Sequence, residues 1–138
     1  MDSFLLWDPD VTYSADGTNV SINENVTYTG TVTLHDDIND EDVTEEIAEE
    51  GAAHLFFFTP GGDAAQRLAV TRTDADANGA PLGLAFRVAV SAGGAAAGAL
   101  DVRLAHYENE ADKRADHTPE NRPGSELELD LTFPVAIR

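Results

Sequence analysis

Four residues of this sequence can bind a transition metal through imidazole nitrogens: His35, His54, His106 and His117. His106 continues an apolar row in an alternating segment, so we expect its side chain to point toward the core or its rim. His35 and His54 stand at the ends of two other patterned segments. Where strand ends converge, these imidazoles form a metal site with a carboxylate such as Glu108 or Glu110. A lone inward histidine, by contrast, is usually a hydrogen-bonded core residue.

Two acidic segments carry oxygen ligands of the kind that calcium prefers. In the first, Asp74, Asp76 and Asn78 alternate ahead of a glycine, as at the start of an EF-hand loop. The twelfth position of such a loop must be glutamate, but counting from Asp74 it is Ala85. The segment is therefore half a motif, and a hairpin tip rich in turn-forming residues explains it as well.

The second acidic segment, residues 36–42, has six oxygen-bearing side chains among its seven residues. Asp36, Asp37 and Asp40 are its candidate calcium ligands. A solvated acidic loop has the same composition, so calcium binding and simple solvation both remain open. Calcium or a transition metal is the only cofactor that the sequence suggests.

Residues 108–125 form the longest stretch with little apolar content, and it interrupts an otherwise negative surface. Its basic side chains and its imidazole are our candidates for partner contact: Lys113, Arg114, His117 and Arg122. Loops longer than about 12–15 residues are usually functional or disordered. A floppy insertion is the alternative interpretation.

The sequence predicts no enzyme. None of its five serines stands in a nucleophile motif, and it has no glycine-rich phosphate loop with an associated lysine. The absence of cysteine excludes a thiol nucleophile, a disulfide framework and a zinc–thiolate site. Glycosidases use a pair of carboxylates, and Glu126 and Glu128 are such a pair in the sequence. We expect both on the solvent face of an alternating strand, however, where solvated charge is the ordinary state.

Charge excludes two further classes of function. Eight basic residues stand against 26 acidic ones, which gives a formal net charge of −18. This charge repels nucleic acids and anionic lipids, and no apolar run approaches the roughly 20 residues of a membrane-spanning helix. Because the acids are spread over most predicted solvent faces, adaptation to high salt explains them better than one acidic patch does. We therefore expect a halophilic microbe as the source.

The location is predicted as extracellular or cell-envelope, in a mature form without its signal peptide. The first seven residues lack the basic start and long apolar middle of an export signal. Two glycosylation-type triplets, beginning at Asn19 and Asn25, favour export slightly. A cytoplasmic protein of a halophile is the alternative.

Alternating apolar residues predict strands in four segments: residues 26–34, 84–90, 100–106 and 127–137. The glycine-rich residues 91–98 between two of them indicate a hairpin loop. Pro134 predicts an edge position or a bulge in the last segment. The non-alternating run from His54 to Phe58 predicts either a central strand covered on both faces or a strand that closes the edge of a sandwich or barrel. Shorter strands are expected near residues 11–13, 18–22 and 67–71, with turns at Asp16-Gly17 and Asn78-Gly79.

One short helix is expected near residues 43–50. Asp42 or Thr44 can cap it, Val43 and Ile47 share a face, and Gly51 ends it. Together the elements predict a single all-β domain over residues 1–138, an antiparallel sandwich of seven to nine short strands, immunoglobulin-like or a related Greek key. A jelly roll and a small barrel are open alternatives.

We therefore expect a non-catalytic, exported or cell-surface interaction module that binds a protein, a glycan or a cell-envelope component. Its oligomeric state is open. A small metal-binding protein built on strand-end histidines is the first alternative, and a structural subunit of a surface or particle assembly is the second.

Overall fold

The computed structural model describes the backbone of residues 2–7, 11–14, 20–36 and 39–138. Its strands, in chain order, are β1 (Asp2–Trp7), β2 (Val11–Ser14), β3 (Val20–Ile22), β4 (Thr27–Asp36), β5 (Glu41–Asp42), β6 (His54–Gly62), β7 (Leu68–Arg72), β8 (Ala85–Val90), β9 (Ala96–Tyr107) and β10 (Ser125–Ile137). The helical elements are α1 (Thr44–Glu49) and the short 3₁₀ turns η1 (Gly51–Ala53) and η2 (Glu110–Asp112). The predicted turn at Asp16-Gly17 lies outside the described residues.

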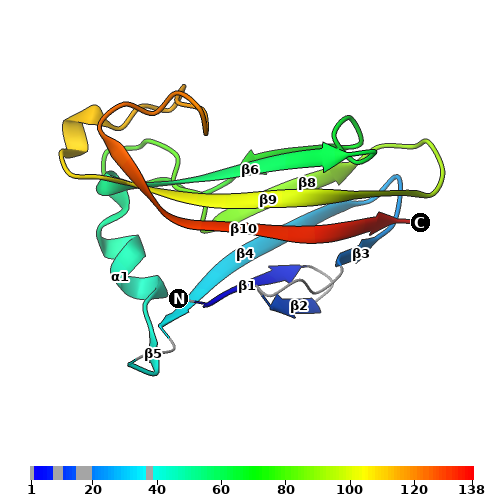
Figure 1. Cartoon of the computed structure of the whole chain (residues 1–138), viewed down its shortest axis with the longest axis horizontal. Helices are drawn as coiled ribbons and strands as arrows, with labels where there is room; N and C mark the ends of the chain where they lie inside the picture. The colour runs from blue at the N-terminus through cyan, green and yellow to red at the C-terminus, as the bar shows by residue number, and fades with distance from the viewer. Residues whose placement is uncertain (1, 8–10, 15–19, 37–38) are drawn as a thin grey trace.

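These strands form two packed sheets (Figure 1). The first has the order β2-β1-β4-β8-β7, with β5 paired to β4, and the second has the order β3-β10-β9-β6. Among the described strand pairs, that of β3 and β10 alone is parallel. Because the strands form two sheets with mostly antiparallel pairing, the predicted antiparallel sandwich is confirmed. Eight of the ten described strands have four residues or more. Strand β1 is an addition that the sequence pattern did not indicate.

Side chains of both sheets meet in the main core. The largest fully buried ones there include Phe56, Phe86, Phe133, Leu34 and Leu100. The alternation predicted for β4, β8 and β9 is confirmed, because their inward rows are the buried ones. Within the described part of the chain, no helix is long and apolar enough to cross a membrane.

The predicted hairpin around residues 91–98 is wrong. β8 pairs with β4 and β7 in the first sheet, whereas β9 pairs with β6 and β10 in the second. Residues 91–95 therefore carry the chain from one layer to the other. Two strands that bury apolar rows can face each other across a core instead of pairing side by side, and their alternation is the same in both cases.

The first four residues of β6 are buried, so both faces of the strand are covered there, and of the two predicted positions β6 takes the edge rather than the centre. It pairs only with β9 and lies at the edge of its sheet. Phe56 joins the main core, whereas Leu55 and Phe57 join a second apolar cluster with Ala105 and Tyr107 on the outer face of that sheet. Residues 108–124, which we call the covering loop, fold over this outer cluster (Figure 1).

β10 does not alternate without interruption, because a bulge lies between Leu127 and Leu129. Leu127 pairs with Ala105 and packs in the outer cluster, whereas Leu129 pairs with Leu104 and packs in the main core. Pro134 does not mark this bulge, but the predicted edge position holds locally, because at Pro134 β10 is paired only with β9 among the described strands. This proline lies just before the three residues of β10 that pair with β3, where a missing N–H removes no bond to that strand.

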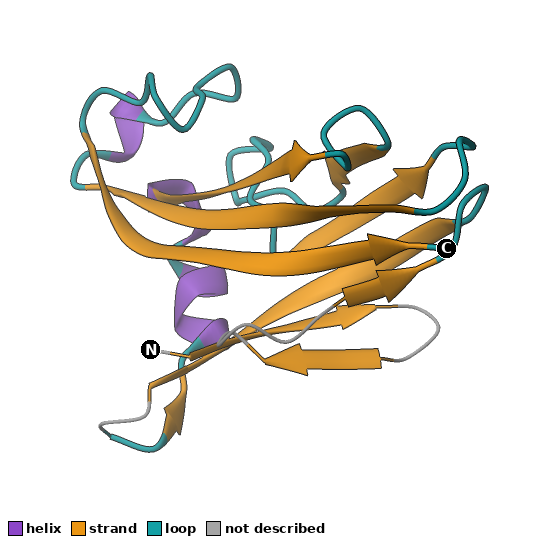
Figure 2. Cartoon of the chain, turned by 45° about the vertical axis from the view of Figure 1, so that its right-hand side comes forward, coloured by secondary structure: helices purple, strands orange, loops and turns teal. Residues whose placement is uncertain are grey.

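The helix forms where predicted and closes one end of the sandwich (Figure 2). The N-cap position is Val43 and has no side-chain cap, so neither Asp42 nor Thr44 caps the helix as predicted. Asp42 Oδ1 accepts a hydrogen bond of 2.8 Å from the N–H of Thr44, the first helical residue, and this bonding lowers the pKa of Asp42. Val43 and Ile47 are buried on its inner face. Thr44 Oγ1 accepts from the Leu34 N–H at 2.7 Å, which ties the helix to β4.

Candidate metal centre

His54 and His106 lie side by side where β6 begins and β9 ends. They are directly paired residues of the two strands, and their rings stack with centroids 4.7 Å apart. His54 is buried, with 2% of its side chain exposed, whereas His106 is 37% exposed. Directly paired residues of neighbouring strands point to the same face, so both imidazoles continue the inward row of the sheet.

Glu128 from the β10 bulge completes the group. Its Oε2 lies 3.5 Å from Nε2 of His54, and its Oε1 lies 3.3 Å from Nδ1 of His106. All three ligand atoms lie within 4.8 Å of one another. Among the described residues, this is the one group of three or more His, Asp or Glu side chains with that geometry.

The distances from Glu128 to His54 and to His106 suit a shared cation better than direct hydrogen bonds. An N–H···O hydrogen bond spans about 2.7–3.2 Å, and both contacts are longer. Zinc binds imidazole nitrogen and carboxylate oxygen at about 2.0–2.2 Å, so neighbouring ligands of one ion are roughly 3–3.5 Å apart. His54, His106 and Glu128 are therefore close to a coordinating arrangement.

The tautomer of His54 is fixed by the main chain. Its Nδ1 lies 2.9 Å from the carbonyl oxygen of Glu50, and a carbonyl can only accept, so Nδ1 carries the proton. The lone pair of the neutral ring is then on Nε2, which faces Glu128. Metal-binding histidines commonly donate their second N–H in this way to a carbonyl or carboxylate.

Glu128 is the ligand that sequence reasoning missed. We expected Glu126 and Glu128 on a solvent face, but the bulge places them on the face of His106. Glu126 is directly paired with His106 and is exposed, so it is a further oxygen near the site. The carboxylates suggested from sequence, Glu108 and Glu110, are exposed residues of the covering loop and do not join the group.

The other two histidines lie elsewhere. His35 faces Asp40, with 3.2 Å between Nε2 and Oδ1. Nδ1 of His117 lies 2.8 Å from the hydroxyl of Tyr107, and the two rings stack over the outer cluster. Burial raises the pKa of Tyr107, which keeps this phenol neutral. The structure therefore unites two of the four predicted imidazoles, not all four.

The first calcium segment has other bonding partners. Asp74 accepts from the N–H groups of Gly83 and Leu84 at 2.6 and 3.0 Å. Asp76 accepts from the N–H groups of Asn78 and Ala80 and from the ammonium group of Lys113. These carboxylates brace the connection between β7 and β8, so they do not converge on a common cation.

The second calcium segment is also bonded internally where it is described. Asp36 accepts from the backbone and side chain of Asn39, and Asp40 faces His35. Asp37 lies outside the described residues. Calcium binding at Asp36, Asp37 and Asp40 stays a prediction.

The predicted partner-binding surface needs correction at Lys113. Its side chain is only 2% exposed and forms an ion pair with Asp76, so it cannot present its charge to a partner. The Arg122 guanidinium bonds to Pro119 within the covering loop and to Ser125 at the start of β10. His117 rests on Tyr107, and Arg114 is the one residue of the four that is exposed. Lys113 and Arg122 therefore form contacts within the protein and are not available to a partner.

A second charged cluster on the outer face already contains its cation. Arg103 Nε lies 2.8 Å from Asp101 and 3.4 Å from Asp130. Burial and the neighbouring Asp130 raise the pKa of Asp101, whereas the two carboxylates raise the pKa of Arg103 despite its desolvation. The guanidinium group occupies the space between the acids, so we assign no metal there.

Comparison with models of known protein families and with characterised proteins gives no match for this chain. The candidate function must therefore be argued from the site itself.

Proposed function

We propose that this protein is a small, non-catalytic β-sandwich that binds one divalent transition-metal ion through His54, His106 and Glu128. The observation that carries the proposal is the convergence of two paired imidazoles and one carboxylate, with ligand atoms within 4.8 Å of one another. Three strands, β6, β9 and β10, each supply one ligand. Binding one ion would therefore link the three strands at the end of the sandwich beside α1.

Ligand chemistry supports zinc, copper, nickel or cobalt over calcium or magnesium. Imidazole nitrogen suits the first group, whereas calcium and magnesium prefer sites made of oxygen alone. Three protein ligands leave coordination positions for water or for the nearby Glu126. Partial exposure of His106 and Glu128 supplies an entry path for the ion.

The test is metal binding by protein produced without an affinity tag, stripped with a chelator and titrated with Zn²⁺ or Co²⁺. Salt at about 0.5 M or more screens non-specific attraction to a chain with net charge −18. We expect about one ion per chain, measured by calorimetry and elemental analysis. Co²⁺ should give the visible absorption bands of nitrogen and oxygen coordination.

Variants locate the site. His106→Ala and Glu128→Gln should abolish stoichiometric binding without unfolding the protein, because both side chains are partly exposed. His35→Ala and His117→Ala are matched controls that remove an imidazole outside the group and should bind like the wild type. No stoichiometric binding by the wild type, or full binding by His106→Ala, would contradict the proposal.

Several finer properties remain proposals beside this one. They are an immunoglobulin-like classification, a halophilic source, an exported or cell-surface location, and a protein, glycan or cell-envelope partner. Membership of a surface or particle assembly is a further alternative. The diffuse negative charge supports the halophilic source, and sizing in 2 M salt tests assembly.

A further inference from the structure

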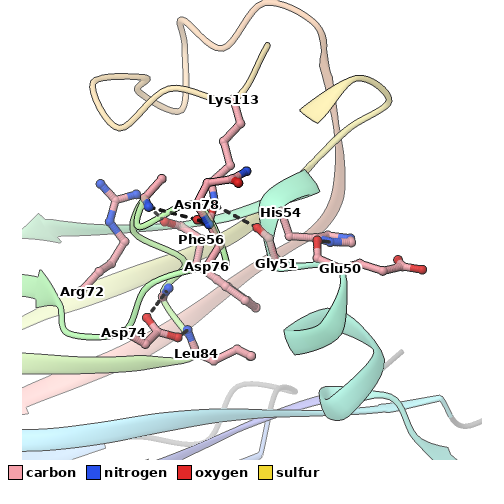
Figure 3. Close-up of polar contacts among 12 residues, drawn as sticks. Glu50, Gly51, His54, Phe56, Arg72, Asp74, Asp76, Asn78, Leu84 and Lys113 are labelled. Atoms are coloured by element: carbon pink, nitrogen blue, oxygen red, sulfur yellow. Dashed lines mark hydrogen bonds and ion pairs between the residues drawn. The ribbon is translucent and has the colours of Figure 1, made fainter. Parts of the chain in front are cut away.

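A buried ion pair lies beside the turn that precedes His54 (Figure 3). Lys113 Nζ is 2.7 Å from Asp76 Oδ2, and the two side chains are only 2% and 1% exposed. The same ammonium group donates to the carbonyl oxygen of Gly51 at 2.8 Å. Lys113 is the only lysine of the chain, and its compact group with three donors fits this narrow position.

The Gly51 carbonyl belongs to the turn that orients His54. The preceding carbonyl, that of Glu50, accepts from the N–H of Ala53 and from Nδ1 of His54, both at 2.9 Å. Gly51 is itself buried, and an added Cβ would lie 3.3 Å from Cβ of Asp76. The turn is therefore docked on the β7–β8 connection through the packing of Gly51 and through Lys113.

We propose that Lys113 and Asp76 are a positioning pair for the metal site, an inference that rests on the proposed function. By holding the Gly51 carbonyl, the pair fixes the turn so that the Glu50 carbonyl accepts from Nδ1 of His54. His54 then presents a free Nε2 to the ion. Without the pair, the Gly51 carbonyl loses its hydrogen bond from the ammonium group, and the tautomer and orientation of His54 are no longer set.

Stability and positioning can be separated with two variants. Lys113→Met leaves Asp76 buried without its partner, so it should destabilise the fold. The double variant Lys113→Met/Asp76→Leu removes both charges, and such replacements are often neutral or stabilising. Neither variant has a donor for the Gly51 carbonyl. Arg114→Met is the matched control, because it removes one positive charge from an exposed position of the same loop.

The first readout is metal affinity at a temperature where every variant is folded. We expect the single and the double variant to bind Zn²⁺ about 10–100-fold more weakly than the wild type, as for the loss of an outer contact to a ligand. Arg114→Met should bind like the wild type. A double variant that is stably folded and binds with wild-type affinity would overturn the inference.

The second readout is the ¹⁵N chemical shifts of the His54 ring in the metal-free protein. The wild type should show one tautomer with the proton on Nδ1, and the double variant should show a mixture. Retention of the single tautomer in the double variant would overturn the positioning role. If the wild type binds no metal, the proposed function fails, and these shifts still decide whether the pair positions His54.

Discussion

At the scale of single residues, the inserted Glu128 determines what the site contains. The bulge lets Leu127 pack outward and Leu129 inward, two residues apart on one strand. A strand without the extra residue would give both leucines the same face. The same bulge places Glu128 beside the two imidazoles, so it supplies the carboxylate of the candidate centre.

Gly30 is another residue whose role depends on its neighbour. It interrupts the inward row of β4, and the ring of Phe86, its paired residue on β8, fills the space above it. Gly30→Ala would drive a methyl group into this buried ring. We expect a loss of about 1–3 kcal/mol in the free energy of unfolding, measured by urea denaturation.

Gly61→Ala in β6 is the matched control for this substitution. No atom lies within 4 Å of the added Cβ, and the backbone there is not left-handed. This variant should be neutral or slightly more stable than the wild type, because alanine narrows the unfolded ensemble. Equal stability of the two variants would show that Phe86 moves aside without cost.

At the scale of elements, the covering loop serves the fold. Lys113 joins it to the β7–β8 connection and to the turn after α1, and His117 rests on Tyr107 of the outer cluster. Arg122 bonds to Pro119 within the loop and to Ser125 at the start of β10. Without this cover, Leu55, Phe57 and Tyr107 would lie on an open face of the sheet. The mixed charge of the loop thus reflects internal contacts.

The Lys113–Asp76 contact also predicts a sensitivity to acid. Burial alone would raise the pKa of Asp76, but hydrogen bonds from Lys113, Ala80 and Asn78 and the charge of Lys113 hold it below its ordinary value. A lowered pKa contributes stability above the unfolded value of about 3.9, and this contribution is lost as the pH falls through the folded value.

Urea midpoints between pH 5 and pH 2 test this expectation. The wild type should lose more stability below about pH 4 than Lys113→Met/Asp76→Leu, which lacks the titrating group. The other carboxylates are common to both proteins, so the difference isolates Asp76. Parallel losses in the two proteins would contradict the assignment.

At the scale of the whole molecule, the net charge of −18 opposes compactness. Raising the salt from 0.1 to 2 M shortens the screening length from about 10 Å to below 3 Å. We expect the melting temperature to rise more than that of a neutral control domain. Each kcal/mol of unfolding free energy gained by screening the repulsion should raise the melting temperature by about 4 °C in a domain of this size.

Thermal unfolding of the metal-free protein across this salt range measures the effect. Adding EDTA throughout removes any contribution from bound cations. A flat response would mean that the acidic residues serve a local partner instead of a saline environment.

The sequence by itself determined the class of the fold. Period-two alternation in β4, β8 and β9 predicted their buried faces, because a side chain's face follows from its position along a strand. The helix was equally readable, since Asp42 and Ile47 act locally. Neither β1 nor the transfer of the chain from β8 to the other sheet could be read in this way.

Only the tertiary structure decided which side chains meet. The pairing of His54 with His106, the bulge at Glu128 and the contact of Lys113 with Asp76 all join residues far apart in sequence. Alternation fixes the face of a residue but not its neighbouring strand or register, which depend on loop closure and packing across the core. The histidines were therefore visible as candidates, whereas their carboxylate partner and the turn that orients them were not.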